Sequence, residues 1–200
     1  MRWLTLYARS RRMPTALAVS TGGAAALWTL WSVCSDARDV GVPMVILTVL
    51  LMVAAVTVTL AGPDDALERT AALPWPPRRA AHLLAALAVL LVVLLATLLT
   101  GARFGPAGLV IRDAAGLLGL TALGAAAIGA ARSWFLPLGW TLAAMVYPLP
   151  DRVWGQILTW QSQPPANRPA AATAAVLAVA GLVAYAVTGP ARTSSAEPPP

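Results

Sequence analysis

Residues 87–99 read LAVLLVVLLATLL, and no charged side chain interrupts this run. The uncharged stretch extends over residues 80–100, close to the roughly 20 residues that an α-helix needs to cross a bilayer. In lipid the backbone must satisfy its own hydrogen bonds, so a stretch of this kind crosses as a helix. We therefore expect a transmembrane helix at residues 80–100.

The whole chain has the composition of a membrane protein. Of its 200 residues, 58% are hydrophobic and 11% are charged, with a mean hydropathy of +0.72. Soluble domains carry about 25% charged residues, and a soluble chain with so few would expose large apolar patches. We expect an all-α, polytopic integral membrane protein, a single transmembrane domain over residues 1–190 followed by a disordered cytoplasmic tail at 191–200. It has about six spans, at residues 15–34, 40–62, 80–100, 114–131, 134–149 and 170–188.

Two segments outside the straight spans are amphipathic. In residues 1–14, Trp3, Leu6 and Tyr7 share one helical face beside several arginines. This pattern fits an N-terminal interfacial helix and a flexible basic tail equally well. Residues 151–169 are expected to lie on the outer membrane surface, since Val153, Trp154, Ile157 and Trp160 share a helical face.

The span at 134–149 contains Pro137, so we expect it to be bent or not to cross straight.

The distribution of arginine predicts the orientation. All 14 basic residues are arginine, and the formal net charge is +6. An N-terminus inside the cell places more arginines in the cytoplasm than outside, as the positive-inside rule requires. The prediction is a multi-pass protein of the bacterial plasma membrane with both termini cytoplasmic and no nucleic-acid partner. The cytoplasmic arginines are Arg2, Arg9, Arg11, Arg12, Arg69, Arg78, Arg79, Arg132 and Arg192, and the outer ones are Arg38, Arg103, Arg112, Arg152 and Arg168.

The residue types present exclude several kinds of chemistry. The chain has no lysine, so it offers neither a Schiff base nor a phosphate-binding P-loop. With His82 as the one histidine and Cys34 as the one cysteine, a zinc site lacks its usual ligands. We therefore expect no enzyme activity, no cofactor and no metal, and any energy for transport must come from a separate protein.

The few ionisable residues near the spans leave two interpretations each. Arg112 and Asp113 are adjacent at the outer end of the span 114–131, either as an interfacial ion pair or as a polar contact in a translocation path. His82 follows Arg78 and Arg79 at the cytoplasmic entrance to the span 80–100, either as an interfacial residue or as a proton relay.

Small residues in the span 114–131 permit close helix packing. Pairs with small-xxx-small spacing include Ala122/Ala126, Ala125/Gly129 and Ala126/Ala130.

Residues 63–79, PDDALERTAALPWPPRR, separate the second and third spans. Asp65 and Glu68 have capping-box spacing, and the prolines from Pro74 onward end the helix that they would begin. This pattern predicts a short cytoplasmic helix, with an ordinary loop as the alternative.

This layout resembles the membrane subunit of a type-two ABC transporter, the export-type permease family. In that family an interfacial helix precedes six spans, and a coupling helix between spans two and three docks on the ATPase. A pattern of glutamate, proline and then arginine leads into span three, which Glu68, Pro74 and the pair Arg78-Arg79 match. Short outer helical elements between spans five and six correspond to the segment from Asp151 to Trp160. The chain departs from the family in being shorter and in its minimal outer loop at 35–39.

The resemblance implies a permease subunit, most simply an exporter, powered by a separate ATP-binding subunit and paired with itself or with a related permease among membrane lipids. The ATPase contact would be made by Asp64, Asp65, Glu68 and Arg69. The arginine-rich and alanine-rich make-up resembles that of high-GC bacteria such as the actinobacteria. A non-transporting membrane scaffold or accessory protein is the alternative, and a small secondary carrier is a third hypothesis.

Overall fold

The computed structural model describes residues 11–61, 75–147 and 152–191 of the chain. Three sequence-based predictions concern residues outside this part. They are the interfacial helix over most of its length (residues 1–10), the cytoplasmic helix with Asp64, Asp65, Glu68 and Arg69, and the tail from residue 192.

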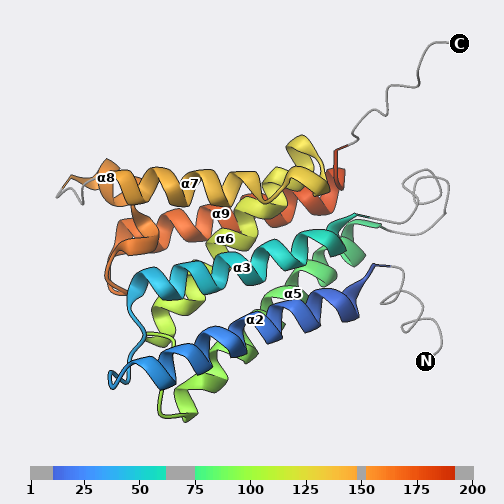
Figure 1. The fold of residues 1–200 in the computed structure, drawn as a ribbon. Coiled ribbons are helices and arrows are strands. Elements are labelled where there is room, and N and C mark those ends of the chain that lie inside the picture. The colour runs from blue at the N-terminus through green and yellow to red at the C-terminus, as the bar shows by residue number, and fades with distance from the viewer. Residues whose placement is uncertain (1–10, 62–74, 148–151, 192–200) are drawn as a thin grey trace, which may run out of the picture.

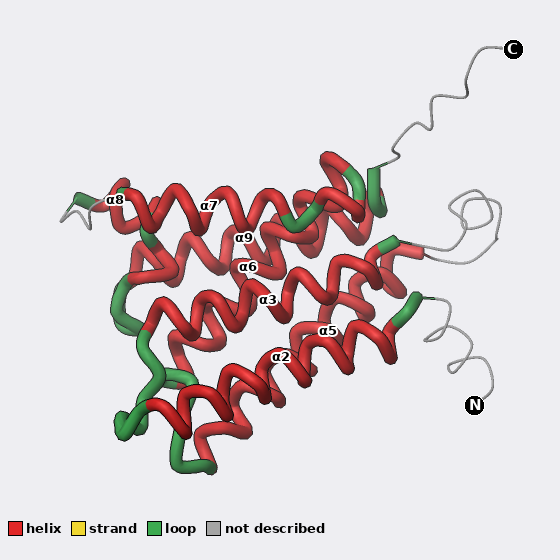
Figure 2. The backbone as a smooth tube through the Cα atoms, viewed as in Figure 1, coloured by secondary structure: helices red, strands yellow, loops and turns green. Residues whose placement is uncertain are grey.

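The described part is all-α, with seven α-helices and three 3₁₀ turns (Figures 1 and 2). Five helices are long and apolar enough to cross a membrane, which confirms a multi-pass helical membrane protein. The helices are α2 (Met13–Cys34), α3 (Val42–Leu60), α5 (Trp75–Ala96), α6 (Ala107–Ile128), α7 (Phe135–Val146), α8 (Val153–Leu158) and α9 (Arg168–Thr188), and the 3₁₀ turns are η1 (Thr97–Leu99), η2 (Ala130–Arg132) and η3 (Trp160–Ser162).

The helices form one bundle with α6 inside it. In the most apolar 18-residue stretch of α6, 78% of the residues are buried inside the bundle, whereas the corresponding share for α2 is 11%. The outer helices expose large apolar side chains, among them Leu17, Val92 and Val179. A soluble bundle would bury such side chains, but in a bilayer they contact lipid at no cost.

The two ends of the bundle are distinct. At one end, which we call the Arg11 end, α2 begins, α3 ends and α9 ends (Figure 1). There the Tyr185 hydroxyl donates a hydrogen bond to the carbonyl oxygen of Leu60 at 2.8 Å. At the opposite end, the Arg103 end, the loops after α2 and after η1 pair through the backbone. Val40 N donates to Arg103 O at 2.8 Å, and Arg103 N donates to Arg38 O at 2.7 Å.

Helices α6 and α9 run in the same direction. Arg112, near the start of α6, contacts the loop that leads into α9, whereas Ala191 N, just after α9, donates to Ala125 O near the end of α6 at 2.8 Å. The chain between them must therefore return along the bundle, and α7 and α8 lie along this return path (Figure 1). Helix α7 has 12 residues and a length of about 18 Å, so it is too short to cross the roughly 30 Å hydrocarbon core by itself.

Two helices begin more than one turn before the residue that the sequence predicts. Helix α5 begins at Trp75 rather than at residue 80, with Pro76 and Pro77 in its first turn, where a missing N–H has no helical partner to lose. Helix α6 begins at Ala107 after Pro106 rather than at residue 114. The prediction was wrong there because it treated Arg112 and Asp113 as the edge of the span, whereas both are buried within the helix.

Two glycines bring the backbones of α6 and α9 into contact. A Cβ added to Gly119 would lie 2.6 Å from the Cα of Ala178, and one added to Gly181 would lie 2.7 Å from the Cα of Gly119. The small residues of α6 thus permit close packing as expected, with the backbone contact at Gly119. They also pack within this chain, so the face of α6 that contains Gly119 is not available as a surface for a second copy.

Candidate functional site

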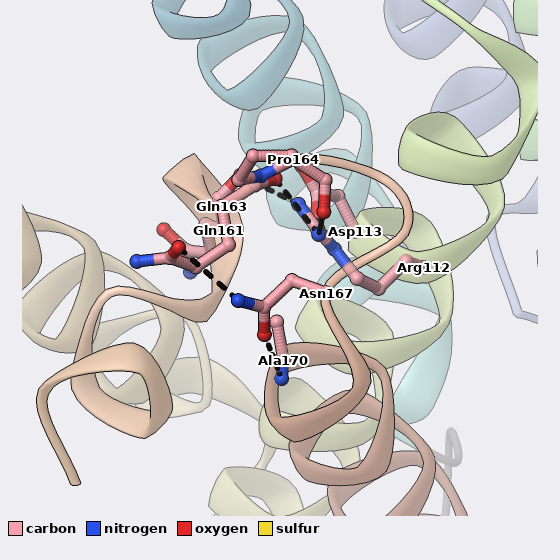
Figure 3. A network of polar contacts seen from close by, with 7 residues as sticks. All are labelled: Arg112, Asp113, Gln161, Gln163, Pro164, Asn167 and Ala170. Carbon is pink, nitrogen blue, oxygen red and sulfur yellow. Dashed lines mark hydrogen bonds and ion pairs between the residues drawn. The ribbon is translucent and has the colours of Figure 1, made fainter. Parts of the chain in front are cut away.

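A buried ion pair lies within α6 near the Arg103 end of the bundle (Figure 3). The Arg112 Nε donates to Asp113 Oδ1 at 3.0 Å. Arg112 is 6% exposed and Asp113 is fully buried. A buried charge persists only when it is paired and hydrogen-bonded, so the further partners of this pair decide what it does.

The guanidinium of Arg112 also holds the segment that connects α8 to α9. Its Nη1 donates to Gln163 O at 2.9 Å and to Pro164 O at 3.1 Å, and its Nη2 donates to Gln161 O at 2.9 Å. These carbonyl groups lie in and just after the turn η3, where the backbone has no helical partners for them. The planar fork of arginine can satisfy several acceptors at once, which a lysine could not do. Arg112 therefore fixes this segment to α6.

A chain of side-chain amides extends the network to both neighbouring helices (Figure 3). The Asn167 Oδ1 accepts from Ala170 N at 2.9 Å and so caps the N-terminus of α9. The Asn167 Nδ2 donates to Gln156 Oε1 at 3.0 Å in α8, and Gln163 Nε2 donates to Thr159 Oγ1 at 2.8 Å. These amides were not predicted from the sequence, although Asn167 followed by Pro169 is a recognisable helix start.

Trp160 anchors the same segment in the bundle core. Its side chain is fully buried, and a Cβ added to Gly116 would lie 2.9 Å from the indole Cζ3. The prediction that Trp160 lies on the membrane surface was wrong, because α8 ends at Leu158 and the helical face does not continue. The other three residues of that face, Val153, Trp154 and Ile157, are exposed.

The predicted polar residues of the third span lie at the Arg11 end. His82 is buried, and its Nε2 lies 3.0 Å from the Thr59 Oγ1 in α3. That hydroxyl donates to Val56 O at 2.7 Å, so it accepts from an Nε2–H of His82. The structure thus places His82 between two helices rather than at an exposed interface.

The two arginines that precede His82 contact other parts of this end. Arg79 reaches the end of α9, where a Cβ added to Gly189 would lie 2.6 Å from the guanidinium carbon of Arg79. A cation at this place is favourable beside the carbonyl groups of a helix C-terminus. The Arg78 guanidinium lies over the Trp75 ring, 5.8 Å from its centroid. The contact of Arg79 thus ties the start of α5 to the end of α9, whereas that of Arg78 lies within α5.

The fold and these two clusters define the class of the protein as a multi-pass helical membrane protein with buried polar contacts near both ends. The chain matches no known protein family, no curated protein and no solved structure in the comparisons made.

Proposed function

We propose that the chain is the transmembrane permease subunit of an ATP-driven, ABC-type transporter, most simply an exporter of the bacterial plasma membrane. One observation carries the proposal. Because α6 and α9 run in the same direction, we infer that the intervening chain crosses once more, by way of α7 and α8. Six such crossings, with the start of α2 and the end of α9 at the same end of the bundle, would agree with the layout of the export-type permease family that the sequence resembles.

The route by which an ATPase would act on this bundle starts at residues 64–73. This segment connects α3 to α5 and contains Asp64, Asp65, Glu68 and Arg69, the residues proposed to contact the ATPase. The two flanking helices are coupled by the bond between Thr59 and His82, and α9 is coupled to α3 by the bond between Tyr185 and Leu60. A push on the segment would therefore move three helices together, as a switch between two bundle arrangements requires.

Removing the charges of the coupling segment tests this proposal. In the double variant Glu68→Ala with Arg69→Ala, we expect at least a tenfold loss of affinity for the ATPase encoded beside this chain, equivalent to about 1.4 kcal/mol. Co-purification and ATP hydrolysis by the reconstituted complex are the measurements. The matched control is Asp36→Ala with Arg38→Ala, a charge pair of the same signs at the Arg103 end. Unchanged hydrolysis in the first double variant, or no bound ATPase with the unaltered chain, would contradict the coupling role.

The interior of the bundle favours a second candidate, a membrane scaffold or accessory protein. Residues 114–128 of the central helix contain one polar side chain, that of Thr121, and its hydroxyl donates to Leu117 O within the same helix at 2.9 Å. This stretch of the central helix thus offers one hydroxyl, already bonded within the helix, to a polar path across the bundle. A scaffold predicts that the protein acts without ATP and tolerates substitutions in residues 64–73, the reverse of the result expected above.

A further inference from the structure

A groove runs between α2 and α5 on the outside of the bundle. Helix α2 is held mainly by α3, where Ser20 Oγ donates to Met52 O at 3.3 Å and Gly23 approaches Leu51. Between α2 and α5 this leaves a cavity of about 210 Å³. Its lining is made mostly of apolar side chains and includes Ala16, Ser20, Val56, Ala86, Val89 and Leu90.

The groove is open to the outer face of the bundle and continues along the two helices. Leu17 and Ala85 line it and are themselves exposed, which places its opening on the lipid-facing side. A second cavity of about 250 Å³ follows towards the Arg103 end between the same helices, lined by residues that include Ala25, Trp28, Val93 and Thr97. A long apolar depression parallel to two spans has the shape and chemistry of a site for an acyl chain.

The Arg11 end of the groove is polar and positively charged. Thr59 and His82 line the groove there, and the guanidinium of Arg11 donates to Thr59 O at 3.5 Å. The opposite end of the groove is closed off by Trp28, whose indole N–H donates to Ala102 O at 2.9 Å. The charge is thus confined to one end, where α2 begins and where lipid headgroups would lie.

We propose that this groove is a binding site for one anionic phospholipid, with an acyl chain between α2 and α5 and the phosphate beside Arg11. Basic pockets between helices on the cytoplasmic side of a membrane bind anionic headgroups, and the cytoplasmic leaflet is rich in such lipids. The predicted orientation places the Arg11 end in that leaflet. The site does not depend on the proposed coupling to an ATPase, since it is formed by α2, α3 and α5 alone.

Retention of lipid by the full chain tests the site. The protein is reconstituted in bilayers of equal parts phosphatidylglycerol and phosphatidylcholine and extracted in mild detergent, and the bound lipid is identified by native mass spectrometry. We expect one phosphatidylglycerol per chain. Ala85→Phe, which fills the groove, should reduce retention several-fold, whereas Ala88→Phe, an exposed alanine of the same helix outside the lining, should leave it unchanged.

The headgroup contact is tested separately with Arg11→Gln. We expect the preference for phosphatidylglycerol over phosphatidylcholine to fall about fivefold, the factor that corresponds to one arginine beside an anionic headgroup. Thermal unfolding of each variant in detergent verifies that the bundle is intact. Equal retention of the two lipids by the unaltered chain would overturn the proposal. So would full retention by Ala85→Phe, or retention that arises only when residues 2–10 are deleted, because the chain's own N-terminus would then occupy the groove.

Discussion

Gly181→Ala is expected to destabilise the folded bundle by about 2–3 kcal/mol, although alanine is the better helix former. The added methyl group would lie 2.7 Å from the Cα of Gly119, and backbone atoms cannot rotate away as a side chain can. Helices α6 and α9 would have to separate, and α6 is the most buried helix of the bundle. The apparent Tm in detergent should therefore fall by several degrees.

A second glycine provides a control in which substitution by alanine should change the stability in the opposite direction. Gly22 in α2 has no atom within 4 Å of an added Cβ, so Gly22→Ala should keep all packing contacts. It should stabilise the protein by about 0.5–1 kcal/mol through the lower conformational freedom of alanine. Equal effects of the two substitutions would contradict the close contact between α6 and α9.

Arg112→Met is expected to cost about 3–5 kcal/mol, the usual effect of removing one partner of a buried ion pair. Asp113 would remain fully buried without its cation, and the carbonyl groups of Gln161, Gln163 and Pro164 would lose their donor. The loop between η3 and α9 would then detach from α6. Limited proteolysis of the protein in detergent should show new cleavage in residues 161–167, together with a lower Tm.

Two further variants at this site, with a control elsewhere, separate the effect of the charge of Arg112 on stability from the effect of its geometry. Arg112→Lys keeps the charge but cannot form the fork, so it should lose much of the same stability. The double variant Arg112→Met with Asp113→Leu should recover part of the loss, because no unpaired charge remains. The exposed Arg38 provides the control, and Arg38→Met should have little effect. If Arg112→Met were as stable as Arg38→Met, the role of Arg112 as the anchor of the loop would be wrong.

The apolar runs of the sequence predict the long helices because lipid imposes one solution on each of them. They place the start of α6 wrongly, since the positions of Arg112 and Asp113 depend on carbonyl groups about 50 residues later in the chain. Local patterns cannot show that pairing. The shared helical face of Val153, Trp154 and Ile157 is visible in the sequence, but the end of α8 before Trp160 is not.

The contact between α6 and α9 shows a similar limit. Small residues are frequent throughout residues 114–131, so their spacing alone does not select Gly116 and Gly119 over the alanines that follow. The choice is made by the partners, Trp160 for Gly116 and the backbone of α9 for Gly119. A parallel pair of helices separated by some 40 residues becomes visible only in three dimensions.

The extra crossing between α6 and α9 is the claim on which the proposed permease layout depends, and single-cysteine labelling tests it most directly. In a Cys34→Ser background, one cysteine is placed at Ala131 or at Ala166, two exposed alanines on either side of the return path. A membrane-impermeant maleimide should label Ala166→Cys in intact cells. In the unaltered chain, it should likewise label the native Cys34. It should label Ala131→Cys only after the membrane is permeabilised. Labelling of both positions from the same side of the membrane would show that α7 and α8 do not cross, and the six-crossing account would be wrong.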